Sequence, residues 1–137
     1  MSLHNKQSGF TLIEMMIVIA IMGIFAGIAI PNYLAWLPKS RLNGAARQVM
    51  GDLMAARMQA VSQNTTVTVA YVSDSKYKIS TEEKTINYSD VTITSFTDIS
   101  FSSRGTATNR TITLNNSTGL GKKVAVAITG RVKITDL

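Results

Sequence analysis

Residues that could carry covalent or metal chemistry are scarce in this chain. It has no cysteine and a single histidine, His4, close to the N-terminus. The usual nucleophile–base pairs and zinc sites therefore lack their components in the rest of the sequence. Glu82 and Glu83 are adjacent, and we expect them on a solvated loop where their side chains diverge. The sequence predicts no enzyme, no cofactor and no metal site.

A glycine-rich segment with two lysines is the other candidate for chemistry. The residues Gly119-Leu120-Gly121-Lys122-Lys123 lack the four-residue spacing between glycines of a phosphate-binding loop, and no serine or threonine follows the lysine. We interpret this segment as an ordinary loop.

The most informative ionisable residue is Glu14, because it stands at the start of a long apolar segment. Residues 15–30 are all apolar or glycine, and a membrane-crossing helix needs about 20 predominantly apolar residues. A carboxylate in hydrocarbon costs about 2.5–3.5 kcal/mol on insertion scales, so such a residue is a functional candidate by default. In a simpler alternative, Glu14 lies near the headgroups and caps the helix, where the helix dipole favours a negative charge.

The residues around Glu14 resemble a known processing motif. Gly9-Phe10-Thr11-Leu12-Ile13-Glu14, with Lys6 before it and an apolar helix after it, is similar to the class III leader of type IV pilins and type II secretion pseudopilins. The resemblance implies that prepilin peptidase cuts after Gly9 and that Phe10 becomes the N-methylated first residue. It also implies that Glu14 pairs with the α-amine of a neighbouring subunit, which places two costly charges together.

This resemblance sets the expected organisation of the chain. Residues 1–9 are a prepilin leader, residues 10–38 a transmembrane helix, and residues 39–137 a periplasmic or extracellular pilin-like domain. The protein is expected in the inner membrane with its N-terminus inside, and outside the cell when assembled in a filament.

Two features of the apolar segment leave alternatives open. A secretory signal peptide could be cut near Ala26–Ala29, although Tyr33 and Trp36 continue the segment as interfacial anchors. Gly23 and Gly27 form a pattern that allows close helix approach, or else a weak point, because glycine costs about 1 kcal/mol relative to alanine in a helix.

Beyond the apolar segment, periodicity predicts an α+β domain in which the long helix continues into antiparallel strands. An apolar stripe at three- and four-residue spacing predicts a helix over about 39–63, and Met50, Met54 and Met58 beside it are interpreted as packing residues. The stripe consists of Leu42, Ala46, Val49, Leu53, Ala56 and Ala60. Period-two alternation over about 65–135 predicts seven strands: Thr65–Val72, Tyr77–Ser80, Val91–Thr94, Ile99–Ser102, Thr111–Leu114, Val124–Thr129 and Val132–Thr135.

A second, looser resemblance covers this domain. The segments Asp52–Val61, Ile99–Gly105, Ile112–Leu114 and Gly130–Lys133 look like the GspH/FimT family of minor pseudopilins and minor pilins. The resemblance implies a minor structural subunit that helps to initiate or tip a type IV pilus or a type II secretion pseudopilus, together with other minor and major pilins or pseudopilins. A membrane-anchored periplasmic domain outside any filament is an alternative.

The charge is concentrated in the last quarter of the chain. Residues 41–103 balance six basic against six acidic side chains, whereas residues 104–137 carry six basic side chains against Asp136 alone. Such asymmetry is typical of a polyanion binder, but a solvated face or the complement of an acidic partner fits it equally.

A possible DNA-binding role follows from the end of the chain. In DNA-uptake members of the FimT group, a C-terminal Gly-Arg-x-Arg pattern supplies the DNA contacts. The sequence Gly130-Arg131-Val132-Lys133 differs at its last position, where lysine keeps the charge but lacks the bidentate fork of arginine. The candidate contacts to duplex DNA are Arg131, Lys133, Lys122 and Lys123.

Overall fold

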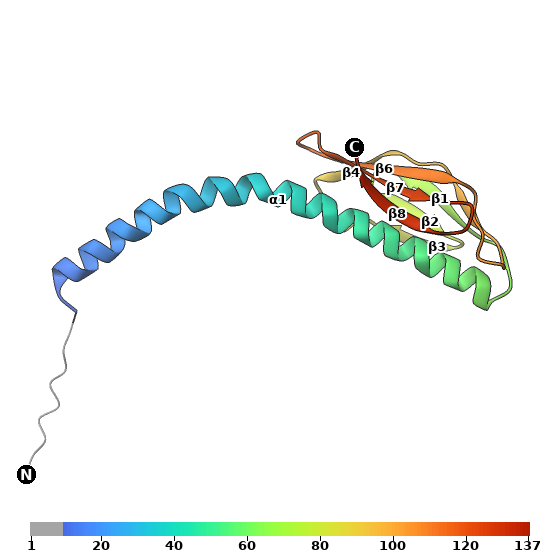
Figure 1. The fold of residues 1–137 in the computed structure, drawn as a ribbon, viewed down its shortest axis with the longest axis horizontal. Helices are drawn as coiled ribbons and strands as arrows, with labels where there is room; N and C mark the ends of the chain where they lie inside the picture. Colours follow the sequence, from blue (N-terminus) through green and yellow to red (C-terminus); the bar gives the residue numbers. More distant parts are fainter. Residues whose placement is uncertain (1–9) are drawn as a thin grey trace, which may run out of the picture. The chain divides into compact units, whose positions relative to one another are not determined.

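The computed structural model describes residues 10–137; residues 1–9, with the predicted leader and Gly9, lie outside the described residues (Figure 1). The described residues form one long helix, α1 (Leu12–Ser62), followed by antiparallel strands. The α+β class expected from the sequence is confirmed. The described residues divide into two compact units, residues 10–36 and residues 37–137, and each is described by itself.

The first unit is the apolar beginning of α1. Every residue from 10 to 36 is exposed, so large apolar side chains face outward on all sides. This part of the helix is long and apolar enough to cross a membrane. The helix begins after Thr11, whose hydroxyl accepts a hydrogen bond from the backbone N–H of Glu14 at 3.3 Å. This is the geometry of an N-cap, which satisfies one of the free donors in the first turn.

The second unit contains two four-stranded antiparallel sheets. One has the order β3-β2-β1-β5, and the other has the order β4-β6-β7-β8. The strands of the first sheet are β1 (Val67–Ser73), β2 (Lys76–Ile79), β3 (Glu82–Thr85) and β5 (Ile99–Phe101), and those of the second are β4 (Val91–Ser95), β6 (Arg110–Asn116), β7 (Gly121–Val126) and β8 (Val132–Asp136).

Each of the seven predicted strands overlaps an observed one, but the observed strands also include Glu82 and Glu83 and the last three residues of the predicted loop Gly119–Lys123. Glu82 and Glu83 lie in the edge strand β3, with Glu83 opposite Lys78 of β2. Charged residues suit an edge strand, and Glu83 also forms an ion pair with Lys76 at 2.6 Å. Strand β7 begins at Gly121, so it includes Lys122 and Lys123. The strand ends at Val126, whereas the predicted strand extended to Thr129, which lies in a turn.

The core forms between the end of α1 and the two sheets. All six residues of the predicted apolar stripe are buried, as is Ala45. Tyr77 of β2 is 1% exposed, and its hydroxyl donates a hydrogen bond to Asp52 Oδ2 on α1 at 2.5 Å. Burial raises the pKa of Tyr77, and the hydrogen bond to Asp52 raises it further by a smaller amount. The polar side of the helix is therefore tied to the first sheet.

Candidate functional site

The predicted processing and assembly residues lie at the start of α1. Phe10 is 78% exposed, and Glu14 is exposed in the first helical turn. Thr11 and Glu14 occupy the positions of a capping box, in which a glutamate three residues after the N-cap supports the helix start. Because the Glu14 side chain is exposed, its carboxylate is accessible to a partner; its pairing with another subunit's amine stays a prediction.

The four predicted DNA-contacting residues do not lie on one surface. Lys122 of β7 stands opposite Asp136 of β8, and the two form an ion pair in which the Lys122 side chain is only 13% exposed. The hydrogen bond from Lys122, with a smaller contribution from Lys39, lowers the pKa of Asp136. Lys122 therefore serves an intrachain ion pair.

The other three basic residues are exposed. Lys123 in β7 and Lys133 in β8 have exposed side chains. Arg131, just before β8, shares a shallow hollow with Lys133. The structure therefore brings Arg131 and Lys133 together, with Lys123 on a neighbouring strand.

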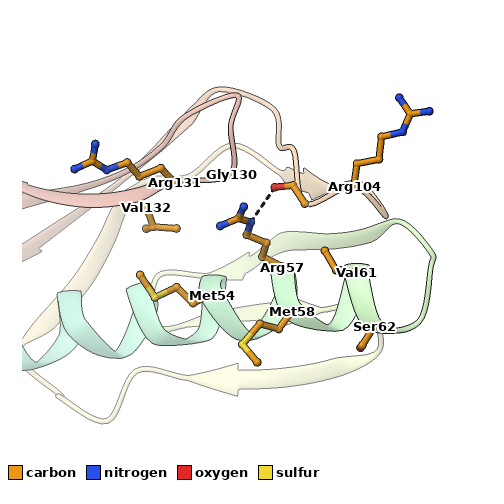
Figure 2. Close-up of a pocket in the computed structure, with 10 residues that line it drawn as sticks. Met54, Arg57, Met58, Val61, Ser62, Arg104, Gly130, Arg131 and Val132 are labelled. Carbon is orange, nitrogen blue, oxygen red and sulfur yellow. Dashed lines mark hydrogen bonds between the residues drawn. The ribbon is translucent and has the colours of Figure 1, made fainter.

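Arg57, a residue that the sequence analysis did not single out, connects the helix to two loops of the domain. Its Nε donates a hydrogen bond to the carbonyl oxygen of Gly105 at 2.9 Å, and its Nη2 donates a longer one to that of Thr129 at 3.4 Å. Gly105 lies in the loop between β5 and β6, and Thr129 lies in the turn between β7 and β8. Arg57 therefore joins α1 to the loop that links the two sheets and to the turn between β7 and β8 of the second sheet. Figure 2 shows Arg57 pointing from α1 toward these loops.

Two glycines allow these loops to close on Arg57. Gly105 and Gly130 have positive φ angles of 78° and 76°, which glycine adopts at little cost. A Cβ atom on Gly130 would collide with the carbonyl oxygen of Gly105 and lie 2.7 Å from Arg57 Nε. The pairs Arg104-Gly105 and Gly130-Arg131 thus meet in space, and each places an arginine next to the contact.

A groove of about 850 Å³ opens beside this contact. Its apolar lining comes from Met54, Met58 and Val61 on α1 and from Val132 on β8, with Arg57, Arg104 and Arg131 around it (Figure 2). Met58 is 71% exposed and Met54 is 40% exposed. The interpretation of these two methionines as packing residues is wrong, because the sheets do not cover this side of the helix; Met50 does pack against the core.

The residues around the groove are suited to binding another molecule. Among residues 10–137, no three His, Cys, Asp or Glu side chains lie close enough to hold a metal ion. The groove combines apolar contact area with guanidinium groups, which bind carboxylates and phosphates through paired hydrogen bonds.

Comparison with known protein families gives two matches along the chain. Residues 4–30 match the prokaryotic N-terminal methylation motif. Residues 45–130, more than half of the chain, match the family of the type II transport protein GspH. The first match covers the predicted leader and the start of α1, and the second covers most of the second unit.

Relatives and solved structures agree with these matches. A fimbrial protein of Pseudomonas aeruginosa is 38% identical over 82 residues, which cover 60% of this chain and 53% of the relative. The type IV major alpha-pilin of Moraxella bovis is 37% identical over 91 residues, which cover 66% and 50%. The chain therefore spans about half the length of these curated relatives.

The fold is similar to that of the type IV minor pilin FimU of Pseudomonas aeruginosa. The TM-score with one crystal structure of that protein is 0.59, at 18% sequence identity over 71% of this chain and 90% of the other. At this identity, the likeness concerns the fold alone.

Proposed function

Because the chain belongs to the GspH family of type II transport proteins, we propose that it is a minor structural subunit that helps to initiate or tip a type IV pilus or a type II secretion pseudopilus. The match of residues 45–130 to this family carries the proposal. The N-terminal methylation motif supports it, because processing by prepilin peptidase precedes assembly in this superfamily. The role is structural, with other pilins or pseudopilins as partners and no catalytic activity.

The proposed assembly step uses the first unit. The exposed apolar part of α1 anchors the chain in the inner membrane, with its N-terminus on the cytoplasmic side and the domain in the periplasm. Cleavage after Gly9 frees an amine at Phe10, and Glu14 of one subunit pairs with the amine of the next. Each charge is costly in lipid, so the pair favours one register between neighbouring helices.

Counting the subunit in purified filaments tests the minor role. The chain should be present in sheared pili or pseudopili at a small fraction of the major subunit. Deleting it should reduce the number of filaments and leave their main composition unchanged. Amounts equal to the major subunit would contradict a minor role. Its absence from filaments, with filament number unchanged by deletion, would favour a membrane-anchored domain outside any filament.

Intact-mass analysis of protein extracted from membranes tests the processing step. The expected mass corresponds to a chain that starts at N-methylated Phe10. A start beyond Ala29 would instead show cleavage as a signal peptide.

Exposed basic residues favour a second candidate function, non-specific binding of duplex DNA. Arg131, Lys133 and Lys123 are exposed, and none of them joins the four ion pairs found among residues 10–137. About three phosphate contacts would give a slope of log affinity against log salt near −3, because each contact contributes about −0.9.

Titration of the full chain in detergent micelles with duplex DNA tests this function. Replacing both Arg131 and Lys133 by alanine should weaken binding alike for every sequence and flatten the salt slope. Replacing Lys78, an exposed residue on β2, should have little effect. Binding that survives the double replacement would refute the DNA site.

A further inference from the structure

We propose that the groove beside Arg57 binds an acidic, apolar peptide segment of a partner protein. The groove is the 850 Å³ hollow lined by Met54, Met58, Val61 and Val132 and flanked by Arg57, Arg104 and Arg131. The inference rests on the proposed function only in so far as the partner is another filament subunit. The expected segment has carboxylates next to a large apolar side chain.

The apolar half of the groove comes from one side of α1. Met54, Met58 and Val61 follow at spacings of four and three residues, which places them on the same face. They are 40%, 71% and 50% exposed. A row of large apolar side chains is therefore uncovered on this face, whereas the apolar stripe on another face of the helix is buried against the sheets. Methionine adapts its shape to varied partners and is common on surfaces that bind peptides.

The charged half comes from the two loops that close on Arg57. Arg104 and Arg131 extend from these loops on either side of Arg57 (Figure 2). None of the four ion pairs among residues 10–137 includes any of the three arginines. The groove therefore presents positive charge that carboxylates within the described residues do not neutralise, and a partner with carboxylates complements it.

The mixture of the two halves favours a peptide over a nucleic acid. Non-specific binding to a DNA backbone comes from positive charge and hydrogen-bond donors, and exposed methionine side chains add nothing to contacts with phosphates. A peptide uses both halves, because an apolar side chain covers Met58 and Val61 while neighbouring carboxylates meet Arg104 and Arg131. Central apolar anchors with charged groups at the rim are the usual arrangement of such sites.

Fluorescence anisotropy of the full chain in detergent micelles tests the proposal, with empty micelles as the blank. The probe is a labelled peptide in which leucine and phenylalanine alternate with glutamate, and its partner probe has glutamine in place of every glutamate. The glutamate peptide should bind, and the glutamine peptide should bind about tenfold more weakly or not at all. Met58→Ser and Arg104→Gln should each lower the affinity for the glutamate peptide about tenfold.

Matched controls are available on other exposed positions. Val72→Ser on β1 replaces another exposed apolar side chain, and Arg110→Gln on β6 replaces another exposed arginine, both away from the groove. Both variants should leave binding unchanged. Because Met58 and Arg104 are exposed, their variants should keep the melting temperature of the wild type. If one of them does not fold, the other still decides the outcome.

Three results would overturn the proposal. In the first, the wild type fails to bind the glutamate peptide or binds both probes equally. In the second, neither Met58→Ser nor Arg104→Gln lowers the affinity for the glutamate peptide. In the third, Met58→Ser weakens binding of duplex DNA, which assigns the groove to nucleic acid. The measurement uses the isolated chain, so its failure is distinct from a failure to enter filaments.

Discussion

Replacing Arg57 by methionine tests whether the contact between α1 and the two loops holds the domain together. Methionine keeps an aliphatic stem of similar reach but removes the donor that bonds to the carbonyl of buried Gly105 at 2.9 Å. Hydrogen bonds to charged groups contribute about 1.5–3 kcal/mol. The second bond, to Thr129 at 3.4 Å, is long and adds little. We therefore expect the free energy of unfolding to fall by about 2 kcal/mol.

Thermal unfolding in micelles, followed by the near-ultraviolet signal of buried Tyr77, measures this loss. A change of 1 kcal/mol shifts the melting temperature of a domain of about this size by roughly 4–8 °C, so Arg57→Met should lower it by about 8–16 °C. The control is Arg47→Met, which changes an exposed arginine on the same helix and should alter stability by less than about 0.5 kcal/mol. Equal melting temperatures for the two variants would refute the reasoning.

Three further substitutions test the glycine contact, the buried tyrosine and the assembly residue. Gly130→Ala should cost at least about 2 kcal/mol in urea unfolding, because it adds a collision to a positive φ, whereas Gly119→Ala, with a φ of 83° and open space around it, should cost only about 1–2 kcal/mol. Tyr77→Phe should cost about 1–3 kcal/mol, because it leaves the Asp52 carboxylate without its donor. Because the pKa of Tyr77 is raised on folding, its contribution to stability is fully present below about pH 10 and is lost above it, where the tyrosine of the unfolded chain ionises first. Titration of stability against alkaline pH should therefore show a shallower fall in the Phe variant. Glu14→Ala should still insert in membranes but be depleted in sheared filaments counted by quantitative blotting, and normal incorporation would leave Glu14 only its capping role.

Most of the fold could be predicted because burial imposes a period on the sequence. The stripe from Leu42 to Ala60 is buried along its whole length, and each predicted strand has its counterpart. Strand β3 was missed because its four residues, Glu82–Thr85, bury no side chain completely. It is held by backbone pairing with β2 and by ion pairs with Lys76 and within β3. Such interactions do not require apolar residues at alternate positions, so the sequence carries no strand pattern there.

The groove could not be predicted from the sequence, because its parts are distant along the chain. Arg57 lies 48 residues before Gly105 and 72 before Thr129. The pairs Arg104-Gly105 and Gly130-Arg131 were visible as motifs, but the sequence does not say that their glycines face one another across a single arginine. An arginine in the middle of an amphipathic helix is ordinarily a solvated residue, so Arg57 gave no signal of its own.

The structure also changes what the charge of the last quarter means. Its six basic residues do not form one surface: Lys122 is paired with Asp136, Arg104 flanks the groove, and Lys123 and Lys133 are exposed on neighbouring strands of the second sheet. Arg131 lines both the groove and the hollow that contains Lys133. A single domain therefore offers a polyanion about three cations in one place, which limits its salt slope to about −3. A steeper measured slope would require several copies of the chain to act together on one duplex.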